Sequence, residues 1–284
     1  MKFTKMHGCG NDYIYIDGSG EKIQDKPGLA VRLSDRHFGI GGDGVIFINP
    51  SETADFEMEM YNADGSRGRM CGNGIRCVAK YVYDHGLTEK KELKIVSCGS
   101  VKTLWLEVQE GLVSRVRVDM GVPVLDVDKI PADPEYTLEG TDEENRLIDV
   151  SYEIGGRKQK MTAVSMGNPH AVLFCRDIGS LDLAASGPMY EHSSVFPEGV
   201  NTEFVEIPDR ENIKMRVWER GSGETFACGT GACASLVASV LTGKTDRKVT
   251  VHLLGGELEI EWNEADDHIY MTGPAVTVFS GEID

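Results

Sequence analysis

One short pattern occurs twice in this chain, and the two copies keep a common register. A Cys-Gly-x-Gly sequence begins at Cys71 and again at Cys228, which sets an offset of 157 positions. The same offset carries MEMYNADGSRGRMCGNG onto MRVWERGSGETFACGTG and, well upstream, Gly10-Asn11 onto Gly167-Asn168. Two separated matches in one register indicate an internal duplication. We therefore expect two homologous halves related by a pseudo-two-fold axis, with equivalent helix starts facing a shared cleft.

Each copy of the pattern stands at the start of a predicted helix. After Cys71, apolar residues recur at i, i+3, i+4 and i+7, and Gly86 fits a C-terminal cap. After Cys228, the run ACASLVASVLTG is apolar or small all round, which predicts a fully buried helix that ends near Gly243.

Strand-like runs in both halves predict β-hairpins. VKTLWLEV (101–108) and VSRVRV (113–118) flank a Glu-Gly turn. KVTVHLL (248–254) and ELEIEW (257–262) flank a Gly-Gly turn in the same way.

The length of 284 residues exceeds one typical domain. The segment from Asp119 to Val150 contains three prolines among many acidic residues, which is typical of a surface connection. We therefore expect an N-terminal domain at 1–128 that carries Cys71 and a C-terminal domain at 129–272 that carries Cys228.

Composition excludes several classes of function. The formal charge of −17 argues against nucleic acid as a partner, because phosphate binding needs a basic surface. No apolar run is long enough for a membrane helix, and the start MKFTKMHGCG lacks the core of a signal peptide, so we expect a soluble, cytoplasmic protein with no membrane partner. The seven cysteines fit neither a secreted disulfide scaffold nor a zinc site, so no metal is expected.

The duplicated cysteines suggest acid–base chemistry at a carbon next to a carboxylate. A helix N-terminus has unpaired amide hydrogens and partial positive charge, which can hold a carboxylate and lower the pKa of an adjacent cysteine. Two such helix starts around one anion would bring two thiols to opposite faces of the neighbouring carbon. One thiolate could then remove a proton while the other thiol returns one, without a cofactor.

Two alternative hypotheses compete with acid–base catalysis. Either cysteine alone would be explained as a small core residue, and only the duplication favours catalysis. A protein of another class, a redox-responsive binding protein, could use Cys71 and Cys228 as a switchable disulfide.

Five segments give the chain a resemblance to a known family. HGCGNDYIYID, NADGSRGRMCGNGIRC, MGNPHAV, GVNTEFV and WERGSGETFACGTGA resemble the signatures of the diaminopimelate epimerase family, in the family's order and over most of the chain. The resemblance implies interconversion of LL- and meso-diaminopimelate without pyridoxal phosphate, in lysine and peptidoglycan biosynthesis. It also implies an α/β (α+β) fold of two pseudo-symmetric domains, each a curved, mostly antiparallel sheet around a buried helix. The C-terminal strand, 273–284, would return to the first domain, and the protein would be a homodimer.

The resemblance also assigns roles to individual residues. Cys71 and Cys228 would be the acid–base pair, with His170 and Glu219 beside the thiols. The carboxylate at the reacting carbon would be held at the two helix starts by Gly72, Asn73, Gly229 and Thr230. The remaining substrate contacts would come from Asn11, Asn62, Asn168, Asn201, Arg220 and the backbone of Glu219.

The residues themselves support these roles unequally. Arg220 can grip a second carboxylate with two parallel hydrogen bonds, a group that a racemase of proline-type amino acids, the rival in the same class, would not need. Asn62 precedes Ala-Asp-Gly and is equally well explained as a turn residue. Gly44 stands where many family members have a substrate-binding glutamine, and a water molecule or Asp43 would have to replace that contact.

Overall fold

The computed structural model describes residues 1–20, 23–68 and 70–283. Contacts between Cα atoms divide the chain into two compact units. The first unit contains Met1–Asp119 and the segment that starts at Thr272, and the second contains Met120–Met271. This division precedes the expected boundary at 128/129, because Val127 already packs in the core of the second unit.

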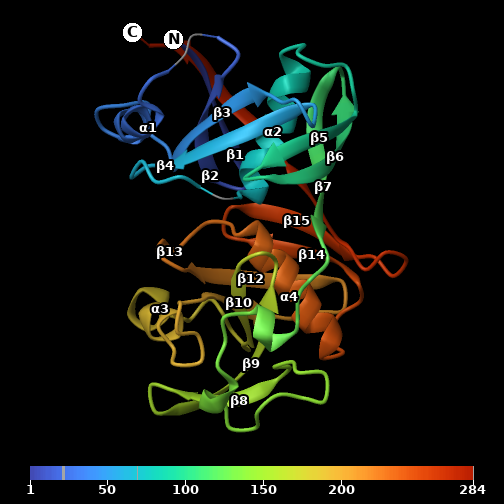
Figure 1. Cartoon of the computed structure of the whole chain (residues 1–284). Helices are drawn as coiled ribbons and strands as arrows, with labels where there is room; N and C mark the ends of the chain where they lie inside the picture. The colour runs from blue at the N-terminus through green and yellow to red at the C-terminus, as the bar shows by residue number, and fades with distance from the viewer. Residues whose placement is uncertain (21–22, 69, 284) are drawn as a thin grey trace. The chain divides into compact units, whose positions relative to one another are not determined.

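The first unit is built on a mixed sheet (Figure 1). Its strands are β1 (Lys2–Gly8), β2 (Asn11–Asp17), β3 (Gly44–Pro50), β4 (Phe56–Asn62), β5 (Glu92–Ser97), β6 (Ser100–Gln109), β7 (Leu112–Gly121) and β17 (Val276–Glu282). They pair in the order β17-β1-β2-β3-β4-β5-β6-β7. The β2–β3 and β4–β5 pairs are parallel and the others are antiparallel.

Two helices pack on this sheet, and α2 (Gly72–Asp84) lies among its strands in Figure 1. Its apolar residues at helical spacing, Ile75 to Val82, are fully buried, and the helix contacts β1, β2 and β6. The predicted end is confirmed, since Gly86 has a left-handed φ of 70° and donates to the Tyr83 carbonyl. The shorter α1 (Lys26–Ser34) forms another cluster with β1–β4 through Leu29 and Leu33.

The second unit repeats this plan. Its strands are β8 (Val150–Ile154), β9 (Arg157–Ser165), β10 (Pro169–Phe174), β11 (Asn201–Glu206), β12 (Asn212–Glu219), β13 (Gly223–Glu224), β14 (Lys248–Leu253) and β15 (Gly256–Trp262). β16 (Ile269–Pro274) spans the point where the chain passes from the second unit to the first. The helices are α3 (Leu183–Glu191) and the buried α4 (Gly229–Leu241), which is followed by Gly243 with a φ of 70°.

The predicted duplication is visible in the topology. In the second unit the order is β9-β10-β11-β12-β14-β15, and the parallel pairs are β10–β11 and β12–β14. This is the pattern of β1 to β6, with α3 in the place of α1 and α4 in the place of α2. Even the register repeats, because Tyr13 pairs with Gly44 and His170 pairs with Asn201, both at the same offset.

Both predicted hairpins are confirmed. β6 and β7 are joined at Glu110 and Gly111, which have φ values of 49° and 83°. β14 and β15 are joined one position earlier than expected, since Gly256 already pairs with Leu253.

The expectation of a surface connection over Asp119–Val150 was partly wrong. Val127, Ile130 and Leu147 are buried in the core of the second unit. The segment contains two 3-10 turns, Val127–Lys129 and Pro134–Tyr136. Its buried residues are spaced too irregularly to give the period of 2 of a strand or the period of 3.6 of a helix. None of the helices in the described ranges is both long enough and apolar enough to span a membrane.

Candidate active site

Cys71 caps the first turn of α2. Its backbone is extended, with φ −132° and ψ 109°, and its Sγ accepts the N–H of Gly74 at 3.2 Å. A side chain on Gly74 would place its Cβ 2.8 Å from Ile46 Cδ1, so the helix start packs tightly on β3. The thiol therefore lies at the positive end of the helix dipole.

Asn11, a predicted substrate contact, lies beside Cys71. Cys71 Sγ donates to Asn11 Oδ1 at 3.1 Å, and Asn73 Nδ2 donates to the same oxygen at 3.4 Å. Asn11 Nδ2 donates to Asp43 Oδ2 at 2.7 Å, while Arg36 holds the other Asp43 oxygen at 2.9 Å. This arrangement fixes which end of the Asn11 amide faces the thiol, and it gives Asp43 a role other than substrate contact.

Cys228 caps α4 in the same manner. Its Sγ accepts the N–H of Gly231 at 3.4 Å and lies 3.5 Å from Thr230 Oγ1. Burial, followed by the nearby carboxylates of Glu219 and Glu203, raises the pKa of this thiol well above its ordinary value. The Cys228 thiol therefore holds its proton at neutral pH.

Glu219 belongs to the same group of side chains. It lies within hydrogen-bonding reach of Cys228, and its Oε1 accepts from Thr225 Oγ1 at 2.5 Å. Burial raises the pKa of this carboxyl, although Thr225, His170 and Cys228 act in the opposite direction. A carboxyl with a raised pKa beside a thiol can exchange a proton with it.

His170 is completely buried and faces two acceptors. Its Nδ1 lies 2.7 Å from Glu203 Oε1, and its Nε2 lies 3.0 Å from Asn168 Oδ1. Glu203 is also completely buried and was missed by the sequence reasoning. The offset of the repeat could have found it, because it places Glu203 over Ile46 and His170 over Tyr13.

Asn201 positions Arg220. Its Nδ2 donates to the Pro169 carbonyl at 2.9 Å, and its Oδ1 accepts the backbone N–H of Arg220 at 3.0 Å. The exposed guanidinium of Arg220 donates to the carbonyls of Glu198 and Gly199, and within the part of the chain that the structure describes it forms no ion pair. Such a cation can bind a carboxylate of a ligand by donating hydrogen bonds to it.

Asn62 and Gly44 both serve the local backbone. Asn62 Nδ2 donates to Ser66 Oγ at 3.0 Å and closes the turn after β4, in agreement with a turn role. A Cβ on Gly44 would lie 2.1 Å from the Tyr61 carbonyl oxygen, so this position has no room for a glutamine.

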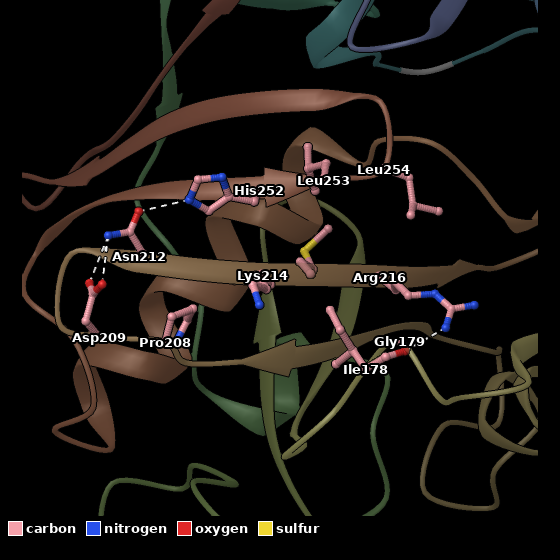
Figure 2. A pocket seen from close by; sticks show the side chains of 11 residues that line it. Ile178, Gly179, Pro208, Asp209, Asn212, Lys214, Arg216, His252, Leu253 and Leu254 are labelled. Atoms are coloured by element: carbon pink, nitrogen blue, oxygen red, sulfur yellow. Dashed lines mark hydrogen bonds between the residues drawn. The ribbon is translucent and has the colours of Figure 1, made fainter.

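A groove of about 470 Å³ in the second unit includes none of the predicted site residues (Figure 2). Its charged groups already have partners: Lys214 pairs with Glu206, Arg216 with Glu224, and His252 with Glu257 and Asn212. The groove is therefore separate from the cysteines. Among the described residues, no group of three or more His, Cys, Asp or Glu side chains is arranged to hold a metal ion.

Comparison with known proteins identifies the family. Residues 3–125 and 162–278 match the family model of diaminopimelate epimerase. The diaminopimelate epimerases of Agathobacter rectalis and Acetivibrio thermocellus are 55% and 53% identical to the chain, each over 100% of this chain and 99% of the relative. The structure of a probable proline racemase from Agrobacterium radiobacter is similar in fold, with a TM-score of 0.68 at 16% identity over 100% of this chain and 92% of that one. The chain belongs to the diaminopimelate epimerase family.

Proposed function

We propose that this protein interconverts LL- and meso-diaminopimelate by a two-thiol mechanism that needs no cofactor. The observation that carries the proposal is the pair of equivalent cysteines, Cys71 and Cys228, each of which caps a buried helix with its sulfur. The names of the relatives, at about half identity over the whole chain, support the choice of substrate.

The proposed reaction has one proton leaving the α-carbon and one arriving. A thiolate at one cysteine takes the α-hydrogen as a proton, and the electron pair of the C–H bond remains on the carbon as a carbanion. The thiol of the other cysteine donates its proton to the opposite face, so the configuration inverts. This mechanism requires Cys71 and Cys228 to reach the same carbon of the substrate, and we propose that they do.

The helix starts supply the electrostatic stabilisation. Gly74 and Gly231 donate their N–H groups to the sulfurs, and we propose that the amides of the two preceding positions in each helix bind the substrate carboxylate. Those positions are Gly72 and Asn73 in α2, and Gly229 and Thr230 in α4. Preorganised amides of this kind stabilise the charge that develops on the substrate carboxylate.

The second half-site supports a donor role for Cys228 in the resting enzyme. Its pKa is raised by burial and by Glu219 and Glu203, so it holds its proton until the carbanion forms. Glu219, whose pKa is also raised by burial, lies within hydrogen-bonding reach of the sulfur and can relay a proton to the resulting thiolate. In the reverse direction the same groups act as the base.

Recognition of the distal amino acid is assigned to the second unit. Arg220 offers a guanidinium that forms no ion pair with the described residues, and Asn201 fixes its backbone. Asn168 is oriented by His170 at 3.0 Å. Asn11 and Asn62 remain proposed substrate contacts from the first unit.

Purified, reduced protein should be tested with LL-diaminopimelate, L-proline and trans-4-hydroxy-L-proline by chiral chromatography, without added cofactor. We expect meso-diaminopimelate from the first substrate and no inversion of the others. Inversion of proline alone would keep the chemistry and overturn the substrate. If none is inverted, the redox-responsive binding protein becomes the better hypothesis.

We further propose that the protein acts in the cytoplasm as a homodimer. Support for a second copy comes from β17, on which Val276, Val278 and Phe279 are each at least 39% exposed. An exposed apolar strand of this kind is a common protein contact.

A further inference from the structure

The pair formed by His170 and Glu203 is unusual for its burial. Neither side chain has any exposed surface, and Nδ1 lies 2.7 Å from Oε1. The other carboxyl oxygen of Glu203, Oε2, is also buried and has no hydrogen-bond partner among the described residues. Because an unsatisfied buried oxygen is destabilising, stability does not account for a carboxyl at this position.

The first unit provides an internal comparison. The offset of the repeat places Ile46 at the position of Glu203 and Tyr13 at that of His170. The packing is equivalent, since a Cβ on Gly74 would meet Ile46 Cδ1 at 2.8 Å and a Cβ on Gly231 would meet Glu203 Oε1 at 2.5 Å. The fold therefore accepts an apolar side chain here, and the carboxyl is not needed to pack the strand against the helix.

We infer that Glu203 is a positioning residue that orients the His170 ring by accepting a hydrogen bond from its Nδ1–H and places a negative charge beside Cys228. The inference rests on the proposed function and deepens it. With Nδ1 held, Nε2 is directed toward Asn168 Oδ1 at 3.0 Å, so one carboxyl orients both a predicted support residue and a predicted substrate contact. The titratable groups of the second unit that act on this cluster are Glu203 of β11, Glu219 of β12 and Cys228 at the start of α4.

Glu203→Gln tests the inference because it keeps the shape of the side chain and removes the charge. Loss of the partner that orients a metal-bound histidine typically costs about 10- to 100-fold, and we expect kcat to fall here by the same factor. The pH–rate profile should shift as well, and Glu203→Asp should restore part of kcat. The matched control is Glu206→Gln on the same strand, where the carboxylate pairs with exposed Lys214 and kcat should stay within about twofold.

A second readout needs no substrate. In protein labelled with ¹⁵N-histidine, the His170 Nδ1 proton should resonate downfield in the wild type and move upfield in Glu203→Gln. If kcat, the pH profile and this resonance all stay at wild-type values, or if both Glu203 variants fail to fold, the inference is overturned. Absence of epimerisation in the wild type would overturn the proposed function alone, because the resonance still decides the role of Glu203.

Discussion

Cys71 and Cys228 occupy equivalent cap positions, yet their neighbours differ. Cys71 donates to the amide oxygen of Asn11, whereas Cys228 lies near the carboxyls of Glu219 and Glu203. An amide cannot exchange a proton at neutral pH, but a carboxyl whose pKa is raised can. The two halves are thus alike in their backbone and distinct in their acid–base chemistry.

Glu219→Gln should lower kcat by about 10²- to 10³-fold, because proton transfer by a positioned group contributes that order of rate enhancement. The amide can still accept the hydrogen bond from Thr225, so the fold should persist. Steady-state kinetics and a thermal unfolding curve would measure both effects. A variant with wild-type kcat would show that Glu219 takes no part in catalysis.

Cys77, which is fully buried in α2, should make stability depend on alkaline pH. Burial raises its pKa from 9.0 to about 11. When the pKa of a group is higher in the folded state, its contribution to stability is complete at pH values below its unfolded-state pKa. That contribution is lost as the pH rises toward its folded-state pKa. Between pH 9 and 11 the free energy of unfolding should therefore fall by up to about 1.4 kcal/mol per pH unit through this group. Urea unfolding should show a shallower decline for Cys77→Ala than for the control Cys98→Ala, where the thiol is exposed. Equal slopes would contradict the assignment.

At the residue scale, the sequence predicted the cysteines because the repeat points to them directly. Glu203 was missed because its burial follows from the pairing of β10 with β11, although the offset of the repeat places it over the buried Ile46. The hydrogen bonds of Asn201 to Pro169 and Arg220 also depend on strand register, which a single sequence does not reveal.

At the scale of the elements, glycines determine how closely strands and helices approach. Gly74 and Gly231 lie against side chains of β3 and β11, where a Cβ would lie 2.8 Å and 2.5 Å from its neighbour. The sequence predicted both buried helices and both hairpins, since periodicity and turn residues are local signals. The tight approach of Gly44 to Tyr61 depends on two strands and was beyond such signals.

Gly44→Gln, which installs the glutamine expected from the resemblance to the family, should harm this chain. Its Cβ would lie 2.1 Å from the Tyr61 carbonyl oxygen, a backbone atom, so the strands must separate. We expect a loss of roughly 1–3 kcal/mol in the free energy of unfolding, the usual cost of overpacking. Gly20→Ala is the control, since its Cβ would meet only the Asp17 carbonyl at 4.0 Å. A stable Gly44→Gln variant with raised activity would show that the site lacks only the glutamine.

At the scale of the whole molecule, the repeated order of strands and helices confirms the duplication that the Cys-Gly-x-Gly pattern predicts. The segment from Asp119 to Val150 was harder to interpret. Its buried residues Val127, Ile130 and Leu147 follow no regular spacing, so only the folded core reveals that they belong to the second unit.

The proposed homodimer can be tested at β17. Val278 is 53% exposed, and Val278→Glu should shift the sedimentation coefficient from dimer to monomer if a second copy covers this strand. Val101→Glu is the matched control, because Val101 is 50% exposed on β6. A Val278→Glu protein that sediments like the wild type would place the interface elsewhere.

The most direct test of the two-thiol account follows hydrogen exchange at the α-carbon. Reduced protein is incubated with LL-diaminopimelate in deuterium oxide, and the wild type is compared with Cys71→Ala and Cys228→Ala by NMR and chiral chromatography. The account predicts that the wild type forms meso product with deuterium at the inverted carbon, and that both variants form none. Inversion by either variant at a rate near that of the wild type would contradict it.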